Sequence, residues 1–354
     1  MRLCGLLSHV NMRVIAVTLA ATFAPGPSFA AKIAATVEYE PTQAPPMPST
    51  PSGGRDAPEM QAGPGTTLSY LDIKAIDGFH VISALWRPDH KPVADSTIII
   101  SVHGSGNSFR STTGRAIGHD LSLKGYAILA INTRQSGRDH VNRDNFYDIS
   151  LDIDAAVQTA KAMGYRTIVL HGQSLGNIQV QYYAATHWDP AIKAVVISGT
   201  FGNLPWKTHN LLVQDEANYR ALRKASHDAL LAGEPGKDLP IKMMYFHNPA
   251  SVSAQHFLTY RDDLSAGADG TFWIRRIPRP ILILRSESDK TVEQFEPYQL
   301  LSAAHAEGSL VPEISFQLIP DPQHVHTEQN GHEFPFNSDL YTAAIGDWLA
   351  AHKL

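Results

Sequence analysis

A serine between two glycines stands where a buried strand is expected to turn into a helix. Residues 167–170 form a short β-branched run typical of a buried strand, and the pattern G-x-S-x-G follows at residues 172–176, with Ser174 at its centre. On such a sharp turn the serine hydroxyl is exposed, and the N–H of Leu175 points to where an oxyanion would form. The spacing therefore predicts a nucleophile at Ser174, with an ordinary tight strand-to-helix turn as the alternative.

A serine hydroxyl is a weak nucleophile, so it needs a general base, and the base needs an orienting carboxylate. Two later strand ends offer both groups. Glu287 and Asp289 follow an expected strand at 280–284, and three histidines follow the last expected strand at 313–319. Because the carboxyl ends of parallel strands meet at one edge of a sheet, we expect these groups to gather beside Ser174. Their chain order, serine, then acid, then histidine, is the one expected after this kind of turn.

From about residue 68 to residue 354 the chain resembles the α/β-hydrolase family. The resemblance is carried by an opening strand pair at 68–86, by the residues His-Gly-Ser-Gly at 103–106, by the G-x-S-x-G turn, by Ser-Glu-Ser-Asp at 286–289 and by the late histidines. The segment 132–138 is similar to the D-x-R-G-x-G stretch of that family, but it has Asn132 in place of Asp and Gln135 in place of the first Gly.

The resemblance implies a role for each matching residue. Ser174 would be the nucleophile, and Asp289 would orient the base. The oxyanion hole would consist of the N–H groups of Leu175 and Ser105, with Gly106 allowing close approach of the backbone.

The base is ambiguous on spacing alone. His324 matches the family's usual distance from the last strand, whereas His332 matches the usual distance to the last helix. A loop lengthens more easily after a fixed catalytic position than before it, so we expect His324 to be the base and His332 to be the alternative. His326 is a third candidate. Together with Glu328 the three histidines could hold Zn²⁺, but their spacing matches no usual zinc pattern and leaves the serine turn unexplained. We therefore expect neither a metal nor another cofactor.

The elements that must position these groups alternate along the chain. Apolar strand runs at 97–102, 126–131, 167–170 and 192–198 are separated by helical spacing, which predicts a mostly parallel sheet covered by helices on both faces. The alternation lapses from about 202 to 276, so this stretch is expected to be a helical cap. Its aromatic residues would line an acyl pocket or form the cap's own core. They are Trp206, Tyr245, Phe246, Phe257 and Trp273.

The first 66 residues differ from the rest. Residues 1–30 have two arginines, a short apolar run and small residues at the end, which predicts a signal peptide cleaved after Ala30. Residues 31–66 are interpreted as a Pro-rich disordered linker, and residues 67–354 as the catalytic domain. The only cysteine, Cys4, lies in the expected signal. The mature protein is therefore expected to be periplasmic or secreted, with no stable membrane anchor.

Composition limits the possible partners. The 354-residue chain has a formal net charge of −5 and no run of Lys and Arg, which argues against a nucleic-acid partner. A small acyl compound is expected instead. The function that follows is a serine hydrolase that cleaves a carboxylic ester or amide through an acyl-enzyme intermediate. An acyltransferase with the same triad and a non-catalytic binding protein of the same fold are the alternatives.

Overall fold

The computed structural model describes residues 38–44, 60–137, 140–213, 215–243 and 250–354. The expected signal peptide, most of the expected linker, Tyr245 and Phe246 lie outside the described residues. Over the described ranges, no helix is both long enough and apolar enough to cross a bilayer.

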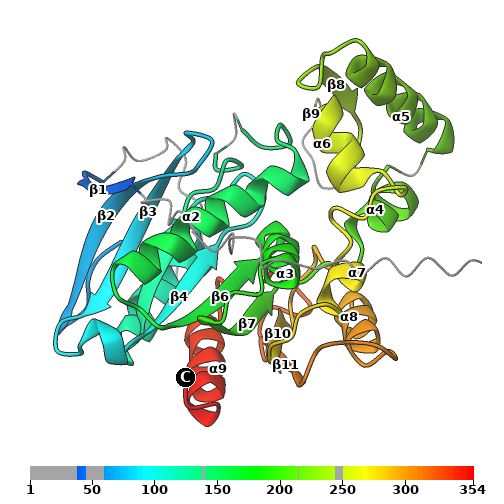
Figure 1. The fold of residues 1–354 in the computed structure, drawn as a ribbon. Coiled ribbons are helices and arrows are strands. Elements are labelled where there is room, and N and C mark those ends of the chain that lie inside the picture. The colour runs from blue at the N-terminus through cyan, green and yellow to red at the C-terminus, as the bar shows by residue number, and fades with distance from the viewer. Residues whose placement is uncertain (1–37, 45–59, 138–139, 214, 244–249) are drawn as a thin grey trace, which may run out of the picture. The chain divides into compact units, whose positions relative to one another are not determined.

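A nine-stranded sheet forms the centre of the described chain (Figure 1). Its spatial order is β1-β2-β3-β5-β4-β6-β7-β10-β11. The pairs among β1, β2, β3 and β5 are antiparallel, and all the others are parallel. The strands are β1 (Glu38–Thr42), β2 (Thr66–Lys74), β3 (His80–Pro88), β4 (Thr97–Val102), β5 (Ala127–Ile131), β6 (Thr167–Gln173), β7 (Ile192–Ser198), β10 (Ile281–Ser286) and β11 (Ile314–Ile319).

The central strands are buried on both faces, which explains their nearly continuous apolar sequence. Every residue of β4 is buried. Because successive side chains point to opposite faces, Ile98 and Ile100 belong to one apolar core, while Ile99 between them belongs to the other.

Helices cover both faces of the sheet (Figure 1). Apolar residues of α2, α3 and α8 belong to one core, and those of α9, together with a π-helical turn over Ile117–Leu121, belong to the other. The flanking helices are α1 (Thr112–Ala116), α2 (Ile149–Ala162), α3 (Leu175–Thr186), α8 (Glu296–Ala304) and α9 (Ser338–Ala351).

The expected cap lies between β7 and β10 and has a small core of its own, which includes Tyr219, Val252 and Phe257. Its elements are α4 (Leu204–Lys207), α5 (Glu216–Leu231), β8 (Asp238–Ile241), β9 (Ala250–Ser253), α6 (Ala254–His256) and α7 (Gly270–Ile274). The cap was expected to be helical, but residues Ala250–Ser253 form β9, which pairs with β8. The helix begins only after Ser253, whose hydroxyl accepts the N–H of His256 as an N-cap.

The expected linker is not without structure. Residues Glu38–Thr42 form β1 on the open edge of β2, although all five are exposed. Backbone hydrogen bonds to an edge need no apolar side chains, and proline is tolerated on an edge strand. The sequence signal, a lack of large apolar residues, could not reveal such a strand.

Candidate active site

Ser174 lies at the turn between β6 and α3 in a strained backbone conformation. Its φ is 53° and its ψ is −123°, a region that residues other than glycine rarely adopt. The surroundings hold it there, because its N–H donates to the carbonyl of Ser198 at 2.9 Å and its own carbonyl accepts the N–H of Asn177 at 3.0 Å. Strain that neighbouring contacts enforce is typical of a nucleophile turn.

The two glycines of the turn are required by space. A Cβ at Gly172 would lie 2.6 Å from the carbonyl carbon of Gly176, and a Cβ at Gly176 would lie 2.7 Å from the carbonyl oxygen of His103. Real Cβ atoms do not approach so closely, so α3 packs against β6 and against the end of β4 only because both side chains are absent.

A hydrogen-bonded chain joins three residues that follow three different strands. The Oγ of Ser174 lies 2.8 Å from Nε2 of His332, and Nδ1 of His332 lies 3.0 Å from Oδ2 of Asp289. A carboxylate can only accept, so Nδ1–H donates to Asp289 and Nε2 is free to accept the serine proton. The three side chains therefore have the arrangement that a serine nucleophile, a histidine base and an orienting acid require.

The carboxylate of Asp289 is buried but well supplied with donors. Burial alone would raise its pKa, but the attraction of His332, the hydrogen bond from its ring and the N–H groups of Thr291 and Val292 together hold the pKa below its ordinary value. These N–H groups lie 2.8 Å and 3.1 Å from Oδ1. Asp289 therefore stays ionised and can stabilise an imidazolium.

The pKa of His332 reflects opposing influences. Burial lowers it, whereas Asp289 raises it through charge and hydrogen bonding, and Glu333 adds to that effect. Lys207 acts in the opposite direction. The net result is a pKa above the ordinary value for histidine, which suits a base that must take up a proton during the reaction.

The turn that carries His332 is also strained. Phe334 has a φ of 54° although it is fully buried, and its ring stacks on Tyr341 with centroids 4.0 Å apart. The Tyr341 hydroxyl lies 2.7 Å from Nε2 of His171 in the strand β6 and 3.0 Å from Oγ of Ser198 in β7. The base is thus anchored through α9 to the strands beneath the nucleophile.

His324 does not lie beside Ser174, as was expected of the base. Nδ1 of His324 lies 2.6 Å from Oδ1 of Asp321, and its ring stacks on Phe336 at 4.0 Å. The alternative, His332, occupies the position beside Ser174, so the additional loop residues precede the base instead of following it. His326 is exposed. In the described part of the chain, no three His, Cys, Asp or Glu side chains are grouped to hold a metal ion.

The two residues expected to form the oxyanion hole lie next to the nucleophile. Leu175 is the first residue of α3, where a backbone N–H has no acceptor within the helix. Ser105 follows Gly104, and a Cβ on Gly104 would lie 3.3 Å from Oγ of Ser174. The close backbone approach is therefore made by Gly104, not by Gly106 as expected. Gly106 instead has a left-handed φ of 65°.

His103 holds this loop in place through two hydrogen bonds. Its Nδ1–H donates to the carbonyl of Gly104 at 2.7 Å, and its Nε2 accepts the N–H of Thr133 at 3.2 Å. Burial lowers its pKa to about 4. His103 is therefore neutral at physiological pH, and its role in the loop is to donate and accept hydrogen bonds.

Comparison with known proteins agrees with this fold. A family model described as the alpha/beta hydrolase fold matches residues 97–337, which is more than half of the chain. The chain belongs to the α/β-hydrolase family. No curated protein matches it in sequence.

Solved structures share the fold of this α/β hydrolase at low identity. Est1E from Butyrivibrio proteoclasticus with ferulic acid bound has a TM-score of 0.56 and 16% identity, over 78% of this chain and 96% of that chain. A hypothetical protein from Pseudomonas aeruginosa also has a TM-score of 0.56, with 17% identity over 82% and 95% of the two chains. The esterase domain of a Rhodothermus marinus protein has a TM-score of 0.50 and 18% identity, over 80% and 97%.

Sequence reasoning missed a link between the base and the oxyanion loop of this α/β hydrolase. Oε1 of Glu333 accepts a hydrogen bond from Nδ2 of Asn107 at 2.6 Å. Burial raises the pKa of Glu333, while the charge of His332 and hydrogen bonds from the Thr112 N–H and Asn107 lower it, and the net shift is upward. The only signal in the sequence was the position of Glu333 directly after a candidate base.

A buried polar cluster connects the cap of the α/β hydrolase to the rest of the chain. Oδ2 of Asp144 accepts from Nε2 of Gln135 at 2.9 Å and from the hydroxyl of Tyr260, in the cap, at 2.8 Å. Gln135 is one of the two residues that depart from the family's D-x-R-G-x-G stretch, and here its side-chain amide donates to the hydroxyl of Tyr260 in the cap. An apolar cluster lies between this contact and the nucleophile: Phe146, Leu175, Ile178, Phe201, Leu204, Tyr260, Ala268 and Val292.

The described cap aromatics lie in different surroundings. Phe257 is fully buried in the core of the cap. Trp206 is partly exposed and contacts Phe295, and Trp273 packs against Tyr182. Leu175, directly after the nucleophile, belongs to an apolar cluster to which the cap also contributes Leu204 and Tyr260.

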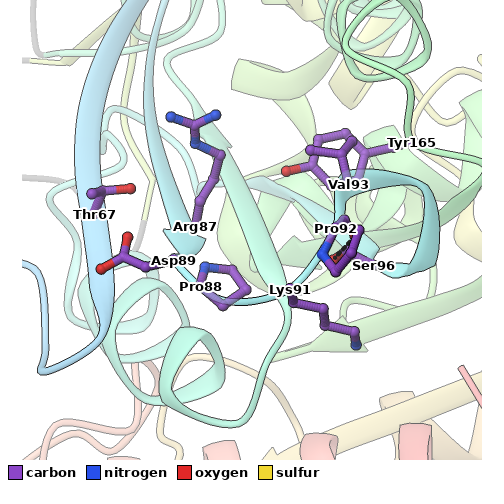
Figure 2. Close-up of a pocket in the computed structure, with 9 residues that line it drawn as sticks. All are labelled: Thr67, Arg87, Pro88, Asp89, Lys91, Pro92, Val93, Ser96 and Tyr165. Atoms are coloured by element: carbon purple, nitrogen blue, oxygen red, sulfur yellow. Dashed lines mark hydrogen bonds between the residues drawn. The ribbon is translucent and has the colours of Figure 1, made fainter.

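A separate hollow lies at the other end of the parallel strands (Figure 2). It is lined by residues that end β3, such as Arg87, and by residues just before β4 and β6, such as Ser96 and Tyr165. Because Ser174 follows the carboxyl end of β6, this hollow is remote from the triad.

Proposed function

We propose that the protein is a serine hydrolase that cleaves carboxylic esters of small acyl compounds. The observation that carries the proposal is the hydrogen-bonded chain from Asp289 through His332 to a strained Ser174. Family membership and the esterases among the structural neighbours support it.

The reaction follows from the geometry in two steps. As Oγ of Ser174 attacks the ester carbonyl carbon, its proton passes to Nε2 of His332, and the imidazolium is stabilised by Asp289. The N–H groups of Leu175 and Ser105 would bind the tetrahedral oxyanion. His332 then gives its proton to the departing alkoxide, which leaves as the alcohol and yields the acyl-enzyme. Water, losing a proton to His332, attacks the acyl-enzyme carbonyl, and collapse returns the proton to Ser174 as the acid is released.

The test is hydrolysis of p-nitrophenyl esters of graded chain length by the wild-type protein and by Ser174→Ala. The wild type should hydrolyse short esters, and the variant should lose activity by several orders of magnitude while its circular dichroism is unchanged. A fluorophosphonate probe should label the wild type at Ser174. Absence of labelling would favour a binding protein of this fold. Labelling together with faster acyl transfer to an added alcohol than to water would favour an acyltransferase.

We also propose that the protein is exported, because residues 1–30 have the pattern of a signal peptide. Intact-mass measurement of protein recovered outside the cytoplasm should give a chain that begins at Ala31. A mature form that keeps the apolar run at 14–24 would contradict this.

A further inference from the structure

Lys207 is a cationic residue in an unusual place. It ends α4 at the start of the cap, and only 1% of its surface is exposed. Burying an ammonium group is costly unless it is paired, and a buried ion pair is seldom better for stability than apolar residues of the same size. The contacts of Lys207 therefore indicate a role beyond stability.

These contacts reach the loop that carries the triad acid. The ammonium of Lys207 lies 2.5 Å from Oε1 of Glu296 and donates to the carbonyl of Thr291 at 2.9 Å. The same Oε1 of Glu296 accepts the N–H of Glu293 at 3.0 Å. Lys207 and Glu296 thus fix the backbone on both sides of Val292, and the N–H groups of Thr291 and Val292 are the ones that bind Asp289.

Glu296 also binds the first residues of the cap. Its Oε2 accepts the N–H of Gly202 at 3.0 Å. The ammonium of Lys207 lies 4.9 Å from the centroid of the Phe201 ring, and that ring lies 6.2 Å from the ring of His332. The pair therefore joins the cap, the acid loop and the surroundings of the base at one point.

We propose that Lys207 is a positioning residue of the triad, which holds the acid loop in register with the base and fastens the cap to it. This role rests on the proposed ester hydrolysis at Ser174. Among the charged groups with the largest effect on the pKa of His332, Asp289 and Glu333 raise it and Lys207 lowers it. Its loss should therefore disturb both the geometry of the base and its protonation.

The experiment compares wild type, Lys207→Met, the double variant Lys207→Met with Glu296→Gln, and Lys224→Met as a matched control. Lys224 is an exposed cap lysine paired with Asp228. The double variant leaves no unpaired buried charge, so it should fold even if the single variant does not. Hydrolysis of p-nitrophenyl acetate is measured against pH, and circular dichroism is recorded for every variant.

We expect both Lys207 variants to lose about 10- to 100-fold in kcat, as small misplacements of catalytic groups do. KM should stay within about twofold, because Lys207 is buried and touches no substrate. In Lys207→Met the acid limb of the pH profile should move to higher pH, since a cation that lowers the pKa of His332 is removed. Lys224→Met should match the wild type.

Wild-type kcat in the double variant would overturn the proposal, because Lys207 would then only neutralise Glu296. Failure of both Lys207 variants to fold would overturn it as well. NMR titration of the His332 ring in wild type and double variant keeps the test independent of turnover. If no ester is hydrolysed and Ser174 is not labelled by a fluorophosphonate, the proposed function fails, while an altered titration would still support the contact from Lys207.

Discussion

The choice between His332 and His324 as the base can be decided by a pair of alanine variants. In His332→Ala, Ser174 loses the acceptor that lies 2.8 Å from its hydroxyl, and Asp289 loses the donor at 3.0 Å. Triad residues act as a unit, and removing a base of this kind costs roughly 10⁶ in kcat, or about 8 kcal/mol of transition-state stabilisation. The double variant with Ser174→Ala should be no less active than either single variant, because the unit is already broken.

His324→Ala is the matched control. Its ring is partly exposed, and what it loses is a hydrogen bond to Asp321 and a stacking contact with Phe336. Contacts of this kind contribute about 1 kcal/mol or less at a partly exposed site, so stability should change slightly and kcat should stay within a few-fold of wild type. The assay is initial-rate hydrolysis of p-nitrophenyl acetate, with thermal denaturation followed by circular dichroism. A severe loss in His324→Ala together with near-wild-type activity in His332→Ala would refute the geometry.

Three further outcomes follow from the site. The kcat/KM profile should have an acid limb with an apparent pKa above about 6.5, because Asp289 raises the pKa of His332 and only the neutral ring accepts a proton. In Asp289→Asn that limb should move to lower pH and kcat should fall, as a pH-rate series would measure. Gly176→Ala should destabilise the fold by about 3 kcal/mol or more, because its Cβ would overlap the carbonyl of His103, and its melting temperature should fall strongly. Gly137→Ala is the control. This residue has a φ of 84° but open space around it, so the change should cost only about 1–2 kcal/mol.

Much of the fold could be predicted because it depends on local patterns. Continuous apolar runs indicated the buried strands, and glycine at 172 and 176 indicated the tight turn that the structure requires. β1 escaped prediction because an edge strand is held by its backbone, which leaves no mark on side-chain composition.

The base escaped a firm prediction for a different reason. His324 and His332 lie on one loop, and spacing along a loop does not determine which part of it folds over the nucleophile. The decision comes from contacts that the loop makes with other elements: Phe334 on Tyr341 in α9, and the Gly331 N–H, which donates to the carbonyl of Ser288 at 3.0 Å. The role of Lys207 could not be predicted from the sequence either, because its hydrogen-bond partners Thr291 and Glu296 lie more than 80 residues away.

The buried histidines also govern how the protein should respond to acid. Burial lowers the pKa of His103 to about 4 and that of His171 to about 3, so the unfolded chain binds more protons than the folded one as pH falls below about 6.5. Each of these two rings then removes up to about 1.4 kcal/mol of folding free energy per pH unit until its folded pKa is reached. His332 has a raised pKa, so it becomes protonated, and can no longer accept the serine proton, at a higher pH than the one at which the folding free energy begins to fall. Acidification should thus first inhibit the enzyme reversibly while it is still folded, and only stronger acid should unfold it.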